Sequence, residues 1–200
     1  MKRTIINIGR QFGSGGKAVA ECIGQRLGIK VYDKELLDAA AERCGMSRDC
    51  FERRDERRSF LNIGSLFGSN RYGAYSRNPL GDAELFRIQS ETIRSIAQNE
   101  SAVFVGRASD YVLRDMDCLD VFVCAPLESR LQRVCERLNV SEAEARSRIA
   151  RCDAEREKFY NCYTFEHWGV ASNYDLCIDS SVLGIEGTAD FIIDFYKRSK

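Results

Sequence analysis

The sequence has only one histidine, His167, and none of its nine cysteines forms a C-x-x-C pair. A structural zinc site needs closely spaced cysteine and histidine ligands, so the sequence offers no metal centre of this kind. Several cysteines, namely Cys124, Cys135 and Cys177, lie instead in apolar segments of core type. We expect these cysteines to be buried thiols of a protein in a reducing compartment.

The sequence also lacks a net charge and a long apolar run. Its 30 lysines and arginines balance 30 aspartates and glutamates, whereas a dedicated nucleic-acid or membrane-surface protein normally carries a basic excess. No stretch approaches the ~20 apolar residues of a membrane span, and the apolar run after Lys2 and Arg3 is too short for a secretory signal. We therefore expect a cytoplasmic protein that binds neither nucleic acid nor membranes.

The 200 residues fit a single domain. Short apolar runs alternate with segments of helical period, which is typical of a parallel sheet flanked by helices. The expected strands are Thr4–Ile8, Lys30–Tyr32, Ala102–Val105, Leu119–Cys124 and Tyr174–Ile178. They predict an α/β fold with a five-stranded parallel sheet and helices on both faces, in which ligands bind beyond the carboxyl ends of the strands.

Helices are expected between these strands. Their ranges are Ala18–Leu27, Lys34–Arg43, Ala83–Gln98, Leu127–Leu138, Ser141–Phe159 and Ile185–Tyr196. Ser141 and Glu144 form the sequence of a capping box at the start of the charged helix. Residues 44–82 do not fit the pattern, and we interpret them as a substrate-side insertion. Residues 160–173 are expected to be a loop, and 141–173 together a region of lid type.

The strongest signal for a ligand is the run from Gly9 to Lys17 (GRQFGSGGK), between the first strand and the first helix. Glycines let the backbone turn its amides inward, and the start of the helix adds partial positive charge, so this loop suits a phosphate. The residues expected to hold a nucleotide are Gly13, Ser14, Gly15, Gly16, Lys17 and Ala18. The alternative is a glycine-rich turn without a ligand.

The loop departs from the standard pattern G-x-x-x-x-G-K-[ST], whose lysine reaches the β- and γ-phosphates and whose hydroxyl holds Mg²⁺. If Lys17 is that lysine, Ala18 stands in place of the hydroxyl and Gln11 in place of the first glycine. If the pattern is aligned on Gly13-Ser14-Gly15, its lysine position falls on Gly16. In the first case, replacing Lys17 by alanine should weaken ATP binding more than replacing Arg10.

With these motifs the chain resembles the cytidylate kinase-like family of P-loop nucleotide kinases, in the branch whose loop reads F-G-S-G-G before a basic residue. The matching motifs follow in order along nearly the whole chain: Phe12–Lys17, Tyr32–Leu37 (YDKELL), Val105–Leu113 (VGRASDYVL) and Arg151–Tyr160. The resemblance implies a P-loop nucleotide kinase fold with a helical insertion and a lid. It also implies ATP and Mg²⁺ as cofactors, and a small-molecule nucleotide as substrate.

Two candidate residues follow strands. Asp33, after the second strand, could manage Mg²⁺ through water or orient the acceptor, and the resemblance matches it to an aspartate of the nucleotide-binding part of the family. It could equally cap the helix that starts at Lys34. Arg107, after Gly106, could bind a phosphate through two hydrogen bonds. By resemblance it matches the arginine that holds the monophosphate, and the alternative is a surface ion pair.

A third group lies on the charged helix. The resemblance matches Arg151 and Arg156 to lid arginines that close over the transferring group, and Asp153 to an aspartate between them. The alternative is a solvated face, because glutamates are interspersed along this helix. We interpret Arg130 and Arg133, on the preceding helix, as part of its exposed face rather than as contacts to ATP.

Together these features predict a phosphotransferase that moves the γ-phosphoryl group of ATP to CMP or dCMP. The expected catalytic residues are Lys17, Asp33, Arg151 and Arg156, and the acceptor would be bound by Asp33, Arg107 and Asp153. Two alternatives stay open: a non-catalytic nucleotide sensor on a kinase-derived fold, which Ala18 favours, and a kinase of a different small molecule. The apolar residues of Phe60–Phe67 indicate a possible homodimer contact.

Overall fold

The computed structural model describes residues 3–33 and 79–199. The chain divides into two compact units, Lys34–Ser95 and a larger unit formed by Met1–Asp33 and Ile96–Lys200. Helix α4 (Pro79–Asn99) begins four residues before the predicted Ala83, and the boundary between the two units falls within its sequence, after Ser95. Three predictions lie outside the described residues: the helix at Lys34–Arg43, the apolar contact at Phe60–Phe67 and nearly all of the insertion at 44–82.

The larger unit is built on a sheet of five strands, all parallel, in the order β2-β3-β1-β4-β5. The strands are β1 (Ile5–Arg10), β2 (Lys30–Tyr32), β3 (Ala102–Val105), β4 (Leu119–Cys124) and β5 (Leu176–Asp179). In the centre of the sheet, Ile8 of β1 is in register with Val105 of β3 and with Val121 of β4. The predicted five-stranded parallel sheet is therefore confirmed, and the carboxyl ends of β1, β2 and β3 meet at one edge.

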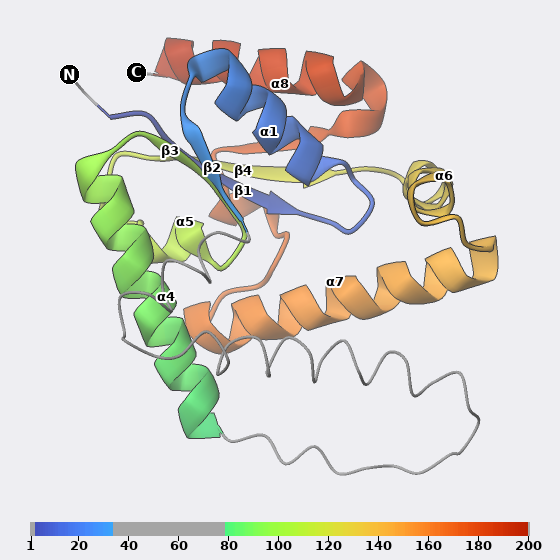
Figure 1. Cartoon of the computed structure of the whole chain (residues 1–200), viewed down its shortest axis with the longest axis horizontal. Helices are drawn as coiled ribbons and strands as arrows, with labels where there is room; N and C mark the ends of the chain where they lie inside the picture. Colours follow the sequence, from blue (N-terminus) through green and yellow to red (C-terminus); the bar gives the residue numbers. More distant parts are fainter. Residues whose placement is uncertain (1–2, 34–78, 200) are drawn as a thin grey trace. The chain divides into compact units, whose positions relative to one another are not determined.

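Helices cover both faces of this sheet (Figure 1). Helices α1 (Gly16–Leu27) and α8 (Ser180–Ser199) pack on one face, where Ile6, Ile8 and Ile192 belong to one buried apolar core. Helices α5 (Ser109–Val112) and α7 (Glu142–Thr164) lie on the other side of the sheet, and α6 (Leu127–Leu138) lies beside the β1–α1 loop. None of the helices within the described ranges is long and apolar enough to cross a bilayer.

Helix α7 begins as predicted and ends later than predicted. Ser141 is its N-cap and accepts a hydrogen bond from the amide of Glu144 at 3.3 Å. The prediction that residues 160–164 belong to a loop is wrong, because the helix continues to Thr164, and both Tyr160 and Thr164 are buried. This segment shows no apolar stripe in the sequence, so its burial against other elements could not be recognised there. A 3₁₀ turn (Ala171–Asn173) then leads to β5.

The cysteines expected in the core are less buried than the sequence predicts. Cys124 and Cys135 are partly buried, but Cys177 is exposed, so the prediction for Cys177 is wrong. Strand β5 lies at the edge of the sheet. Its residues Leu176 and Ile178 point to one face of the sheet and pack on the apolar core. Side chains alternate along a strand, so Cys177 faces the other way.

A polar pair lies within the sheet, on the face opposite α1. Asn7 of β1, only 1% exposed, donates from Nδ2 to Oδ1 of Asp120 in β4 at 2.7 Å, and the Oδ1 of Asn7 has no hydrogen-bond partner among the described residues. Burial raises the pKa of Asp120 from 3.8 to about 6, against the opposing effect of the Asn7 hydrogen bond. The folded chain therefore binds this proton more tightly than the unfolded chain does. The stability that this proton contributes is complete below about pH 4 and is lost as the pH rises through about 6.

Replacing Asp120 by asparagine is expected to raise the free energy of unfolding at about pH 7.5 by about 1 to 3 kcal/mol, since a shift of ~2 pKa units corresponds to at most about 3 kcal/mol. The new amide can also donate to the unpartnered Oδ1 of Asn7. Denaturant unfolding at two pH values measures the effect, which should disappear near about pH 4. Asp194→Asn, on the exposed side of α8, is the control. A variant less stable than wild type at the higher pH would contradict this reading.

Candidate functional site

The loop between β1 and α1 has the backbone shape of an anion cradle. Gly13 and Gly15 both have φ of 81°, and Gly15 is the N-cap of α1. A Cβ on Gly13 would also lie 2.9 Å from Cγ2 of Val134, so glycine is needed there for space as well as for conformation. Hydrogen bonds among the described residues leave four amides of the loop and helix start without an acceptor: those of Gly13, Gly15, Lys17 and Ala18. A phosphate would satisfy such donors.

The carbonyl of Ser14 is held from outside the loop. This residue is fully buried, and its carbonyl oxygen accepts hydrogen bonds from Nη1 of Arg133 at 3.0 Å and from Oγ of Ser180. Arg133 also donates to Oγ of Ser180 at 2.9 Å, which joins α6 to the start of α8. Because these donors occupy the Ser14 carbonyl, the amide of Ala18 stays available to a ligand.

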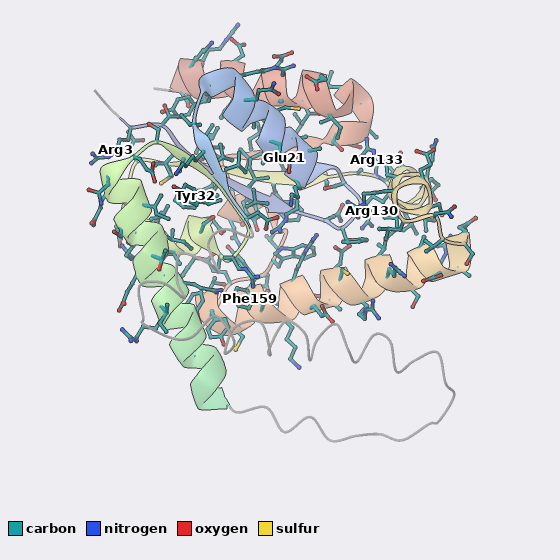
Figure 2. All side chains as sticks on the ribbon, viewed as in Figure 1. Arg3, Glu21, Tyr32, Arg130, Arg133 and Phe159 are labelled. Carbon is teal, nitrogen blue, oxygen red and sulfur yellow. The ribbon has the colours of Figure 1, made fainter. Side chains whose placement is uncertain are left out.

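Arg130 and Arg133 extend from α6 toward this loop (Figure 2). The Arg130 side chain is only 11% exposed, and its Nη1 lies 2.6 Å from Oδ2 of Asp153. The interpretation of these two arginines as an exposed helix face is therefore wrong. Arg130 directly precedes Leu131, and Arg133 directly precedes Val134, and both of these apolar residues point inward. The position of the two arginines beside the apolar stripe is the feature of the sequence that could have indicated their burial.

Helix α7 holds the backbone of the loop through two of the predicted residues. The amide of Phe12 donates to Oδ1 of Asp153 at 2.7 Å, and Nη1 of Arg156 donates to the carbonyl of Arg10 at 2.9 Å. The Arg156 guanidinium also lies over the Phe12 ring, 5.6 Å from its centroid. Asp153 and Arg156 thus reach the loop, whereas Arg151 is exposed on the same helix.

Two cations flank Asp33 where β2 ends. Nζ of Lys17 lies 3.2 Å from one carboxylate oxygen of Asp33, and Nη2 of Arg10 lies 3.7 Å from the other. The two cations differ in burial, because the Lys17 side chain is 56% exposed and the Arg10 side chain only 18%. Lys17 also lies 4.0 Å from Glu21. The alternative role of Asp33 as a helix cap concerns residues outside those that the structure describes.

Arg10 is a residue that the sequence analysis did not place in the site. Burial, together with the charges of Arg156 and Arg107, lowers the pKa of its guanidinium to about 9, while Asp33 acts in the opposite direction. Burial also lowers the pKa of Arg156, against the opposing effect of Asp153. With a pKa of about 9, the Arg10 guanidinium is still protonated at neutral pH. The repulsion between Arg10 and the guanidinium groups of Arg156 and Arg107 marks a place where a bound anion would be stabilised.

The turn after β3 brings the backbone close to Arg10. Gly106, Arg107 and Ala108 have φ of 71°, 63° and 52°, three consecutive residues in the left-handed region. A Cβ on Gly106 would lie 1.8 Å from Nη1 of Arg10, so only glycine leaves room for that guanidinium. The predicted site residue Arg107 is thereby placed near enough to Arg10 to affect its pKa.

A carboxyl group follows this turn and links two helices. The hydroxyl of Tyr160 in α7 lies 2.7 Å from Oδ2 of Asp110 in α5 and 3.2 Å from Oε2 of Glu166. Burial raises the pKa of Asp110. Burial also raises the pKa of Tyr160, and the negative charge of Asp110 raises it further. Asp110 and Tyr160 were not singled out individually, although both lie in motifs that carry the family resemblance. They fix α7 beside the strand ends.

The chain is similar to known proteins in both sequence and structure. Residues 5–182 match the model of the cytidylate kinase-like family. A cytidylate kinase from Methanopyrus kandleri is 30% identical over 187 residues, which cover 88% of this chain and 84% of that protein. An uncharacterized protein from Eubacterium ventriosum has a crystal structure with a TM-score of 0.70 at 26% identity, covering 98% of this chain and 99% of that one.

The comparison also settles the fold. Shikimate kinase from Acinetobacter baumannii, solved in complex with shikimate, matches with a TM-score of 0.53 over 100% of this chain and 96% of its own. At 12% identity this match shows the fold alone. Together with the strand order, it confirms the predicted P-loop kinase fold.

Proposed function

Because the chain belongs to the cytidylate kinase-like family, we propose that it transfers the γ-phosphoryl group of ATP to a nucleoside monophosphate, with CMP or dCMP as the preferred acceptor. The observation that carries the proposal is the loop, whose available amides lie beside a half-buried cluster of arginines at the edge of the sheet. Phosphoryl transfer depends mainly on positioning and on positive charge around the transferring group, and this arrangement supplies both.

Each part of the site has a role in this proposal. The available amides of Gly13, Gly15, Lys17 and Ala18 hold the donor phosphates. Arg156 stabilises the charge that develops on the transferring group. Arg107 holds the phosphate of the acceptor at the end of β3. Asp33 orients the cations around it, since both Lys17 and Arg10 pair with its carboxylate.

Mg²⁺, when bound with ATP, would neutralise charge on the donor phosphates. The chain fits this ion only in part. The two residues after Gly16 are Lys17 and Ala18, so the start of α1 supplies no hydroxyl ligand. Asp33, whose carboxylate lies 3.2 Å from Nζ of Lys17, is 28% exposed, and it fits an outer position in which water separates it from the ion. Asp153 is engaged by Arg130 and by the Phe12 amide.

The proposal is tested by ADP formation from MgATP with a panel of nucleoside and deoxynucleoside monophosphates. We expect the highest kcat/KM with CMP or dCMP, and a fall in kcat of about 10²- to 10³-fold in Arg156→Ala. Arg198→Ala, at an 80% exposed position at the end of α8, is the control. Binding of ATP without turnover of any monophosphate would contradict the proposal and favour a nucleotide sensor.

A further inference from the structure

The start of α1 decides which residue supplies the phosphate-binding cation. The standard pattern places its lysine directly after the last glycine of the loop. Here Gly15, in the left-handed conformation with φ of 81°, is the N-cap, and Gly16 is the first residue of the helix. With Gly15 as the last glycine, the first position of the pattern falls on Arg10, the lysine position on Gly16 and the hydroxyl position on Lys17.

We infer that Arg10, at the end of β1, replaces the missing lysine and binds the terminal phosphates of the donor, whereas Lys17 does not. This inference rests on the proposed function of the loop as a nucleotide site. It reverses the expectation that follows from taking Lys17 as the lysine of the pattern.

The space around Gly16 relates the two departures from the pattern, at positions 10 and 16, to each other. A Cβ on Gly16 would lie 2.6 Å from Cβ of Arg10 and 3.1 Å from its Cγ. A side chain at position 16 and a side chain at position 10 therefore exclude each other. The standard pattern has glycine first and lysine later, whereas this chain has arginine first and glycine later. Each sequence leaves room for one long cationic side chain. In this chain it is attached to the end of strand β1, whereas in the standard pattern it is attached to the start of the helix.

The two cations also differ in how well they are already paired. The Arg10 guanidinium donates no hydrogen bond to any described residue, and its one ion pair among these residues, with Asp33, is long at 3.7 Å. It is nevertheless 82% covered, since its side chain is 18% exposed. Lys17 has a closer partner in Asp33 at 3.2 Å, a second in Glu21, and a side chain that is 56% exposed to water. A buried cation with open donors gains more from a phosphate than a solvated, paired one does.

The test measures binding of ATP and of inorganic tripolyphosphate by titration calorimetry, without an acceptor. Arg10→Gly is expected to weaken both affinities about 10- to 100-fold, the range of one or two charged hydrogen bonds. Lys17→Ala should weaken them less than Arg10→Gly does. The decisive variant is the double exchange Arg10→Gly with Gly16→Lys, which restores the first glycine and the lysine of the standard pattern and should raise the affinity at least tenfold above that of Arg10→Gly. Arg10→Lys, which keeps the charge, should retain an intermediate affinity.

The outcomes separate this inference from the proposed function. Unchanged affinity in Arg10→Gly, a larger loss in Lys17→Ala, or no recovery in the double variant would overturn the role of Arg10, even if the wild type phosphorylates CMP. Wild-type protein that binds ATP through Arg10 and phosphorylates no acceptor would leave this role intact and contradict only the transfer reaction. Wild-type protein that binds neither ATP nor tripolyphosphate would overturn both. The melting temperature of each variant without ligand shows whether it is folded.

Discussion

Asp153→Ala is expected to lower the free energy of unfolding by about 2 to 4 kcal/mol, because it removes the partner of a largely buried cation. Asp153 lies 2.6 Å from Nη1 of Arg130, whose side chain is 11% exposed and whose Nε already lacks a partner among the described residues. The same substitution leaves the Phe12 amide without its acceptor at 2.7 Å. For a chain of this length, the melting temperature should fall by roughly 5 to 15 °C.

Two further variants identify the cause of this loss. Asp153→Asn keeps an oxygen acceptor for the Phe12 amide and loses the charge, so it should be intermediate between wild type and Asp153→Ala. Arg146→Ala is the matched control on the same helix, because it removes an exposed ion pair with Glu142 that contributes at most about 0.5 kcal/mol. Denaturant unfolding measures the free energy of unfolding of all three variants. If Asp153→Ala lost no more than the control, the contact between α7 and the loop would have no energetic importance.

Gly106→Ala should weaken ATP binding by about tenfold or more while the protein stays folded. The new Cβ would lie 1.8 Å from Nη1 of Arg10. Because that atom is the far end of a flexible side chain, the guanidinium moves away from the site and the backbone does not. The left-handed conformation at Gly106, with φ of 71°, adds a strain of about 1 to 2 kcal/mol to the alanine variant.

Gly28→Ala separates the strain from the displacement of Arg10. Gly28 ends α1 with a similar φ of 65°, and a Cβ there would meet nothing within 4 Å. Both variants should lose comparable stability in thermal unfolding, but only Gly106→Ala should lose ATP affinity in calorimetry. Equal affinities in the two variants would show that the position of the Arg10 guanidinium does not matter for ATP.

The sequence predicts the sheet well because its strands are short, apolar and clearly separated. Ala102–Val105 and Leu119–Cys124 have the predicted bounds, and the helix Leu127–Leu138 does as well. The alternation of strands and helices then determines which strand ends share an edge. For this reason the sequence could also place Asp33 and Arg107 near the glycine loop.

The remainder of the site depends on contacts between residues far apart in the sequence. The Ser14 carbonyl is held by Ser180, 166 residues later, and by Arg133, 119 residues later. Arg10 belongs to the predicted loop after the first strand, and only the close approach of Gly106 and Gly16 shows where its guanidinium lies. Such proximity has no periodic signal, so neither spacing nor composition could have predicted it.

The attachment of α7 to the loop limits how the nucleotide can enter and leave. Asp153 bonds the Phe12 amide, and Arg156 bonds the Arg10 carbonyl, so the same helix that carries charge to the reaction also supports the backbone of the cradle. If α7 swung outward as a rigid flap, both bonds would break and the glycine turn would lose its support. Product release by that route would therefore require the binding site to be taken apart and rebuilt in every catalytic cycle.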